Sequence, residues 1–358
     1  TRAVNFRIDT LSEDLEGITV QGKDNFNFGV RNLRPVEDMG IYSGRKSKVV
    51  KAEQIQGNVA FEKGRQLFNK VAGLNVWESD GAGLQLDVGS RGLNPKRTSN
   101  FNTRQNGYDI AADALGYPET YYTPPTQALQ QIEIIRGASS LQYGPQFGGM
   151  INFELKDPPA NEVFRLNTEQ SIMGFQLFDQ PNPGPVSSYT SVSGTSESDK
   201  WSYFGYYKYK QGSPGDGNTW RPNSEFRVHN SFAATTYRPT GDLSISLELT
   251  KMNYLAQQPG GLTDRLFEED PSQSIRSRNW FRVDWNMAAL KVDYRISDQL
   301  KLNLRNFGMA GGRASVGHLG RIDRADPGAE RNLLKDNYRN FGNETRLLYN
   351  YEVLGQQS

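Results

Sequence analysis

The sequence predicts a small α+β domain followed by the strands of a transmembrane antiparallel β-barrel. The first observation is a change of pattern after Pro158, from short mixed elements to long segments of alternating apolar and polar residues. The second is the composition: 36 glycines with 18 Phe, 17 Tyr and 5 Trp suit a barrel with aromatic girdles better than a helical enzyme. The third is a regular alternation of long and short connections between these segments.

Charge and cysteine content exclude several classes of protein. The 41 basic and 40 acidic side chains nearly balance, whereas a general nucleic-acid binder needs a clustered basic face. The chain has no cysteine, which excludes disulfide frameworks, thiolate zinc sites and cysteine nucleophiles. No run of eighteen apolar residues occurs, so a helical membrane protein is also excluded.

Composition divides the chain into three regions, 1–45, 46–160 and 161–358. Residues 1–45 are polar, which predicts a tail with at most one short strand. Residues 46–160 predict an α+β segment with a helix over 60–70 and strands near 75–77 and 131–135. The chain begins without a signal peptide and stops just past a strand-like run, so we expect it to be a fragment.

The third region predicts eight strands. The clearest is DLSISLELT, in which Leu243, Ile245, Leu247 and Leu249 share one face. The alternation is lost near residues 287–289, where we expect a β-bulge. The expected strands are 163–175, 186–197, 201–211, 225–238, 242–256, 280–296, 299–311 and 337–352.

The connections between these strands indicate a membrane barrel. Short links at 198–200, 239–241 and 297–298 alternate with long ones at 176–185, 212–224, 257–279 and 312–336. A transmembrane barrel has short periplasmic turns and long extracellular loops. Closing eight strands leaves space only for side chains, so a folded domain inside requires a larger barrel, of about 22 strands in plugged transporters. The eight strands are then the first part of an incomplete barrel.

Two glycine-bearing motifs frame the α+β segment. They are VGSRGLNP, from Val88 to Pro95, and IEIIRGASSLQYGPQFGGMINFELKDP, from Ile132 to Pro158. The ordered set of RG, IRG, YG and GG before an apolar-Asn-apolar strand resembles the plug of TonB-dependent outer-membrane receptors. This resemblance implies an α+β plug domain inside a 22-stranded barrel in the outer membrane of a Gram-negative bacterium.

Within that family the sequence is most similar to receptors of the ferric dicitrate type. The likeness rests on RGLNP at 91–95, GYP at 116–118, YGPQ at 143–146 and QQPGGLTD at 257–264. The sequence departs from the type at Tyr117, where an amide is usual, and at NGYD, 106–109, where a DG pair is usual. The resemblance implies a ferric citrate or similar anionic siderophore as cargo.

Basic and aromatic residues near the expected plug apex are the candidate ligand site. Arginine suits carboxylates because its planar fork bonds both oxygens, and a basic loop attracts an anionic chelate. A solvated polar loop, or tyrosines packed between plug and barrel, is the alternative. The candidates are Arg91, Lys96, Arg97, Arg104, Tyr117, Tyr121 and Tyr122 in the plug, with Arg276 and Arg278 in a barrel loop.

The tail carries a candidate segment for energy coupling. An extended segment can add a strand to a periplasmic partner through main-chain hydrogen bonds. Residues Glu16, Gly17, Ile18, Thr19 and Val20 resemble the TonB box, which implies a TonB-like energy transducer as partner. The alternative is the last strand of an N-terminal domain, because RAVNFRID resembles the end of the carboxypeptidase-regulatory-like module carried by many Bacteroidetes receptors.

The sequence predicts no enzyme, no cofactor and no metal site of the protein's own. Only His229 and His318 are present, without a zinc-binding spacing, so the iron is expected to arrive with the chelate. An importer of glycans or cobalamin remains as an alternative cargo assignment. Two alternatives come from other classes of protein. An outer-membrane barrel lipase would need a Ser/His pair. A soluble β-rich adhesin would differ from a receptor in having no outer-membrane lipid around it.

Overall fold

The computed structural model describes residues 30–357 except 38, 43–45, 56, 58, 63, 81, 84, 114–118, 138–142, 144–145, 173–184, 213–220 and 354–355. The candidate TonB box at 16–20 and the candidate ligand residue Tyr117 lie outside the described residues. Within the described part, helices long and apolar enough to span a bilayer are absent.

The N-terminal half is built on a six-stranded sheet with the order β1-β4-β9-β10-β7-β8. Neighbouring strands are antiparallel except β10 and β7, which are parallel. Almost every residue of the central strands is buried, since the sheet is covered on both faces. The strands are β1 (Val30–Arg31), β4 (Ser47–Lys51), β7 (Phe101–Gln105), β8 (Tyr108–Asp109), β9 (Leu129–Arg136) and β10 (Gly149–Leu155).

Short elements surround this sheet. Two hairpins, β2 (Val36–Glu37) with β3 (Gly40–Ile41) and β5 (Leu74–Glu78) with β6 (Leu86–Ser90), pair separately. The helix predicted over 60–70 is shorter, α1 (Gly64–Phe68), because Glu62 has a φ of 54°, which an α-helix does not allow. The 3₁₀ turns are η1 (Ala52–Gln54), η2 (Lys96–Thr98) and η3 (Thr126–Ala128). We call residues 30–155 the plug.

The C-terminal half is one eight-stranded antiparallel meander, which we call the wall. The eight predicted strands are confirmed, and the last two are longer at their long-loop ends than the expected 299–311 and 337–352. The strands are β11 (Arg165–Ile172), β12 (Val186–Thr195), β13 (Trp201–Gln211), β14 (Phe226–Thr240), β15 (Leu243–Gln257), β16 (Trp280–Arg295), β17 (Leu300–Gly317) and β18 (Asn332–Tyr349).

The bulge expected near residues 287–289 is wrong. β16 keeps an unbroken register with β15 and β17 through Met287 and Ala289. Both residues are buried on the plug side, while Ala288 and Leu290 are exposed on the other face. Apolar residues therefore occupy both faces here, because one face packs on the plug and the other belongs to the apolar outer band of a barrel. The polar alternation is lost without any change in backbone pairing.

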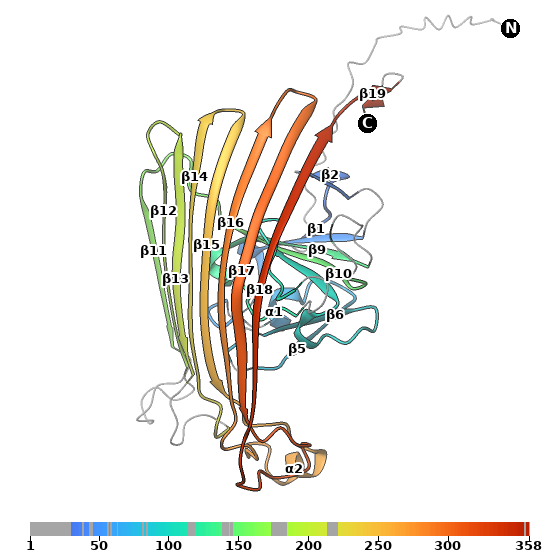
Figure 1. Cartoon of the computed structure of the whole chain (residues 1–358), viewed down its shortest axis with the longest axis vertical. Coiled ribbons are helices and arrows are strands. Elements are labelled where there is room, and N and C mark those ends of the chain that lie inside the picture. The colour runs from blue at the N-terminus through green and yellow to red at the C-terminus, as the bar shows by residue number, and fades with distance from the viewer. Residues whose placement is uncertain are drawn as a thin grey trace, which may run out of the picture.

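The connections segregate by length, as the sequence predicts. Figure 1 shows the short turns at one end of the wall and the long loops at the other, where α2 (Asp264–Glu269) lies. The side chain of Thr263 caps α2 by accepting from the backbone N–H of Leu266. A last hairpin, β19 (Glu352–Val353) with β20 (Gln356–Gln357), follows β18. This asymmetry gives the wall a loop end and a turn end.

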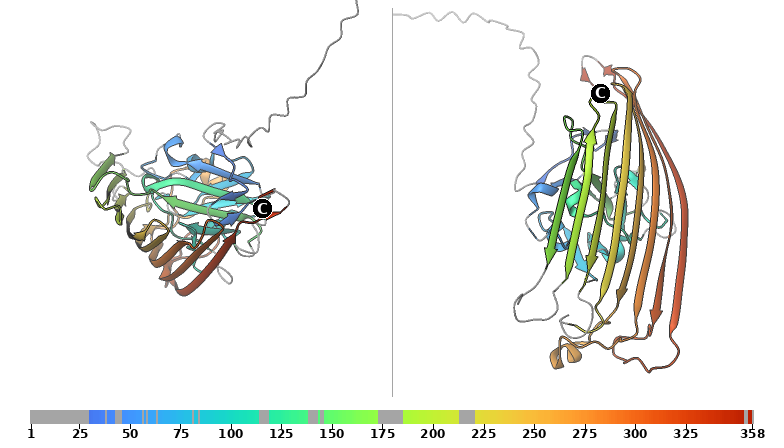
Figure 2. Two further views of the ribbon diagram at one scale, coloured as in Figure 1. Left: turned by 90° about the horizontal axis from the view of Figure 1, so that it is seen from above. Right: turned by 90° about the vertical axis from the view of Figure 1, so that its left-hand side faces the viewer.

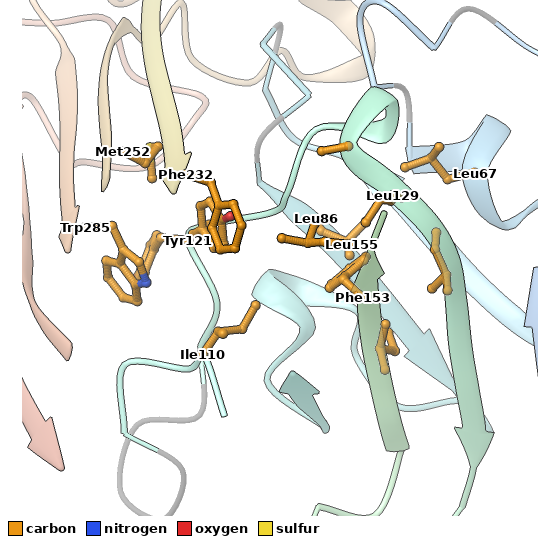
Figure 3. Close-up of a cluster of buried hydrophobic side chains, with 14 of the residues drawn as sticks. Leu67, Leu86, Ile110, Tyr121, Leu129, Phe153, Leu155, Phe232, Met252 and Trp285 are labelled. Atoms are coloured by element: carbon orange, nitrogen blue, oxygen red, sulfur yellow. The ribbon is translucent and has the colours of Figure 1, made fainter. Parts of the chain in front are cut away.

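The wall curves around the plug and buries aromatic residues against it. Figure 2 shows the plug in the concavity of the wall, seen along the strands in its left-hand view. Trp285 is fully buried, and its ring centroid lies 5.7 Å from that of Tyr121 in the plug. Figure 3 shows wall residues Phe232, Met252 and Trp285 beside this part of the plug. One apolar core, continuous from Leu67 to Met309, thus joins the two parts.

Candidate ligand site and plug-to-wall contacts

Arg97 lies in a charged network that joins the plug to the wall. Its Nη1 donates to Glu119 Oε2 at 2.7 Å and to the Tyr121 hydroxyl at 2.9 Å. From β17, Arg313 donates to the same hydroxyl at 2.6 Å and to Asp336 at 2.5 Å. Burial lowers the pKa of Arg97, but Tyr121 and Glu119 more than offset this effect and leave it above its ordinary value. Arg97 is therefore a charged structural contact in this conformation.

Arg104 is buried, with a side chain only 3% exposed, and binds a different part of the wall. It donates to both carboxylate oxygens of Glu344, at 2.5 and 3.0 Å. Its other donors bind Asn102 Oδ1 and the Gly107 carbonyl, each at 2.6 Å. Arg346 donates to Glu344 as well, at 2.8 Å. Arg104 thus joins plug strand β7 to wall strand β18 by a bidentate ion pair.

The structure does not bring Arg97 and Arg104 together. Their wall partners are Arg313 with Asp336 and Glu344, and the register of β17 and β18 sets residue 313 opposite 336 and residue 305 opposite 344. Eight residues of strand separate these levels, which corresponds to about 26 Å. Arg97 lies toward the loop end and Arg104 toward the turn end, so Arg104 is not at the plug apex. The candidates therefore divide between two ends of the plug.

Arg91 and Lys96 have exposed side chains in the same glycine-containing segment as Arg97. The segment turns sharply because Arg91 and Gly92 have φ values of 56° and 76°. The Arg91 guanidinium lies against Gly137 of the IRG motif, where a Cβ would meet it at 2.4 Å. These two cations remain accessible, in contrast to Arg97 and Arg104.

Tyr121 and Tyr122 pack between plug and wall. Both are buried, and the Tyr122 hydroxyl donates to Gln105 Oε1 at 2.8 Å and lies 3.1 Å from the hydroxyl of Tyr206 in β13. Their position agrees with the alternative given in the sequence analysis, in which these tyrosines pack between plug and barrel. Replacing either tyrosine would therefore disturb the plug–wall interface rather than a surface that contacts ligand.

Arg276 and Arg278 hold two long loops together. Arg276 is buried and donates to the carbonyls of Gly320, Arg321 and Arg324, at 3.2, 2.8 and 2.6 Å. Arg278 donates to both carboxylate oxygens of Asp326, at 2.8 and 2.5 Å. Loop 258–279 is thus tied to loop 318–331 at the loop end of the wall. Both arginines use their donors on protein atoms in this conformation.

This loop tie should survive mild acid. Hydrogen bonding from Arg278 holds the pKa of Asp326 well below its ordinary value of 3.8. A depressed carboxyl pKa contributes stability that is full above the ordinary value and is lost as pH falls through the folded value. Hydrogen–deuterium exchange of residues 318–331, corrected for intrinsic rates, should therefore show constant protection from pH 7 to about pH 4 and a loss only below it. Asp326→Asn should reduce protection across the whole range, and a loss of protection between pH 6 and pH 5 in the parent would contradict the assignment.

The sequence did not single out the most buried ionic group among the described residues of the interface. Glu62 of the plug accepts from Lys208 at 2.7 Å and from Lys210 at 2.5 Å, and all three side chains are at most 5% exposed. Burial raises the pKa of Glu62, but the two ammonium groups outweigh it and lower the value. Alternation along β13 could have identified the two lysines as plug-facing. In the segment YYKYK, Lys208 and Lys210 share the plug-facing side of the strand with Phe204 and Tyr206.

The plug-facing side of the wall carries more basic than acidic side chains among the described residues. Strand register and alternation decide which residues point inward. Inward basic residues are Arg165, Lys208, Lys210, Arg238, Lys291, Arg295, Lys301, Arg305, Arg313 and Arg346, and inward acidic residues are Glu169, Glu248, Asp293, Asp336 and Glu344. Clusters of three metal-ligating side chains are absent from the described part of the chain.

A folded plug held in the concavity of an antiparallel wall with long loops at one end is the architecture of a plugged β-barrel. Residues 43–150 match the family described as TonB-dependent Receptor Plug Domain. The chain therefore has the fold of a TonB-dependent receptor and comprises the plug and the first part of its barrel. The predicted fold class is confirmed.

Solved structures agree with this fold. The unliganded ferric citrate transporter FecA superposes with a TM-score of 0.73 at 23% identity, over 87% of this chain and 45% of FecA. The copper transporter OprC gives 0.64 at 17% identity, over 89% and 46%. BauA, the ferric preacinetobactin receptor from Acinetobacter baumannii, gives 0.66 at 12% identity, over 91% and 47%. The chain thus spans about half the length of each.

Proposed function

We propose that the full-length protein is an outer-membrane importer of an anionic ferric chelate, driven by a TonB-like energy transducer. The observation that carries the proposal is the basic excess on the plug-facing side of the wall. Fixed positive charge in a low-dielectric channel raises the local concentration of anions. Ferric citrate and similar carboxylate-rich siderophores have the required charge, and the likeness to FecA favours citrate.

Arg91 and Lys96 are the residues that we assign to first contact with the chelate. They are exposed on the plug segment that also carries Arg97. Arg97, Arg104, Arg276 and Arg278 are committed to protein partners in this conformation. Guanidinium and ammonium groups bind carboxylates by charge-assisted hydrogen bonds. The iron belongs to the cargo, and no covalent chemistry is required of the protein.

Energy coupling is assigned to the tail that precedes β1. In this proposal residues 16–20 add a strand to the periplasmic partner, whose pull is transmitted along the chain into the plug sheet through β1. β1 pairs with β4, which pairs with β9 at the centre of that sheet. A force on the tail therefore acts on the sheet that also carries β7 and Arg104.

Titration of the detergent-solubilised full-length receptor tests the cargo assignment. Tryptophan fluorescence should report saturable binding of ferric citrate and a much weaker response to citrate alone or to an uncharged ferric hydroxamate. Replacing both Arg91 and Lys96 by alanine should raise the Kd for ferric citrate at least tenfold, because two charge-assisted contacts are lost.

The matched control removes one cation from the outer face of the wall. Arg227 is exposed and alternates with buried Phe226 and Val228, so it points away from the plug. Arg227→Ala should leave the Kd for ferric citrate unchanged. Equal responses to the neutral hydroxamate and to ferric citrate would contradict an anionic cargo, and glycans and cobalamin would be tested next.

A further inference from the structure

Among the described residues, polar contacts hold the plug against the wall on two sides. The first group joins it to β12 and β13, and we call these the β12–β13 contacts. They are the Glu62 ion pairs with Lys208 and Lys210, together with the hydrogen bond from Ser187 Oγ to the Ala60 carbonyl at 3.0 Å. The second group joins the plug to β15, β17 and β18, and we call these the β15–β18 contacts; they include the hydrogen bond from Arg313 of β17 to the Tyr121 hydroxyl at 2.6 Å.

The β15–β18 contacts come from plug strands β7 and β8 and the segments beside them. Arg104 binds Glu344, and Asn106 Nδ2 donates to Glu248 Oε2 at 2.9 Å. Asn340 of β18 donates to the Ala112 carbonyl at 2.8 Å. The plug is thus held on two sides by different chemistry.

The charged β15–β18 contacts keep partners if the plug moves away. Glu344 retains Arg346 of its own strand, and Glu248 retains its ion pair with Lys291 of β16. Arg104 retains its hydrogen bonds to Asn102 and Gly107 within the plug. If the plug separates from the wall on this side, each of these charged groups therefore keeps at least one hydrogen-bonding partner.

The β12–β13 contacts do not have this property. Among the described residues, the hydrogen bonds of the two lysines go to plug atoms: besides Glu62, Lys208 binds Gln127 Oε1 at 2.8 Å and Lys210 binds the Ala82 carbonyl. Glu169 of β11 lies near Lys208, but it accepts from Gln127 of the plug. Separation on this side would leave two buried ammonium groups and the Glu62 carboxylate without their partners.

A cavity of about 880 Å³ lies between plug and wall toward the turn end. Among its lining residues are the β15–β18 contact residues Arg104, Asn106 and Glu248. The wall contributes six cations and three carboxylates to the lining, and the cations are Arg238, Lys291, Arg295, Lys301, Arg305 and Arg346. An opening at the β15–β18 contacts would therefore join this cavity to the loop end along a wall surface with more basic than acidic side chains.

We infer that the passage for the chelate opens between the plug and strands β15–β18, while the plug stays attached to β12–β13. The wall cations that line the cavity then border this passage. This inference rests on the proposed import function. The plug moves away from the wall on its β15–β18 side and stays attached on its β12–β13 side.

Two matched cysteine pairs test the inference in the full-length receptor, and each introduces the only cysteines within these 358 residues. Each pair combines a buried plug alanine with the wall residue that donates to its carbonyl: Ala112→Cys with Asn340→Cys, and Ala60→Cys with Ser187→Cys. A short bifunctional methanethiosulfonate joins each pair in cells, because each cysteine thiolate displaces a sulfinate and forms a reducible disulfide with the linker, and ferric citrate binding and uptake are measured before and after reduction. Linking residues 112 and 340 should lower uptake at least tenfold with binding unchanged, and reductant should restore uptake. Linking residues 60 and 187 should change uptake less than twofold.

Loss of uptake from both links, from neither, or from the 60–187 link alone would overturn the inference. If the unlinked receptor imports no ferric citrate, the cargo assignment fails, and a second readout replaces uptake. Single cysteines at Met309 on β17 and Ser191 on β12 have inward positions and similar burial, 6% and 5% exposed. Maleimide labelling that rises with cell energisation only at position 309 supports the inference. A rise at position 191, or at neither position, overturns it.

Discussion

Glu62→Gln is expected to destabilise the plug by about 3–5 kcal/mol, the usual cost of removing one partner from a buried ion pair. The substitution preserves shape and a carbonyl acceptor but leaves the ammonium groups of Lys208 and Lys210 without a carboxylate on a surface that is at most 2% exposed. The measurement is urea-dependent protease cleavage of the plug in the refolded full-length receptor. The plug should become cleavable at a lower urea concentration, whereas the barrel should not.

A triple apolar variant distinguishes two causes of this stability loss, the unpaired lysine charges and the loss of packing. Glu62→Leu with Lys208→Met and Lys210→Met removes all three charges and keeps similar volumes, so it should recover most of the lost stability. Its plug–wall attachment would then depend on apolar contact alone. A triple variant as unstable as Glu62→Gln would show that packing at this position, rather than the unpaired lysines, causes the effect.

The wall could be predicted from the sequence because its pattern is local. A strand that faces the plug on one side and the outside on the other alternates every second residue, and Leu243 to Leu249 show this directly. The pattern fails where both faces are apolar, as at Met287 to Leu290, and there a bulge was expected where the register is continuous. The alternation of long and short loops could be predicted from the number of residues between consecutive strands alone.

The candidate site could be predicted only in part, because it depends on contacts distant in sequence. Arg97 and Arg104 are seven positions apart, and a loop containing both was expected at the plug apex. The strand β7 between them carries Arg104 to the other end of the wall, where its partner is Glu344. No local pattern identifies a partner 240 residues away. The same limit hid the pairing of Glu62 with Lys208 and Lys210, although alternation already placed both lysines on the plug side.

The GG motif at 148–149 gains a physical explanation from the structure, and it gives the second large prediction. Gly149 begins β10 with a φ of 130°, a region that residues with a Cβ rarely adopt. A Cβ at this position would lie 1.8 Å from the carbonyl oxygen of Ile135, an atom of the neighbouring strand β9. Backbone in the middle of a buried sheet cannot move away without breaking the ladder between β9 and β10.

Gly149→Ala should therefore cost more than about 4 kcal/mol, which places it among the exceptional single substitutions, and the plug should fail to reach its protease-resistant state. Two glycines serve as graded controls in the same urea and protease assay. Gly92 has a φ of 76° with open space around it, so Gly92→Ala carries only backbone strain, about 1–2 kcal/mol. Gly241 has open space and no positive φ, so Gly241→Ala should be close to neutral. If Gly149→Ala were no worse than Gly92→Ala, the contact with Ile135 would not be the reason for glycine at this position, because backbone strain alone would then account for the whole effect.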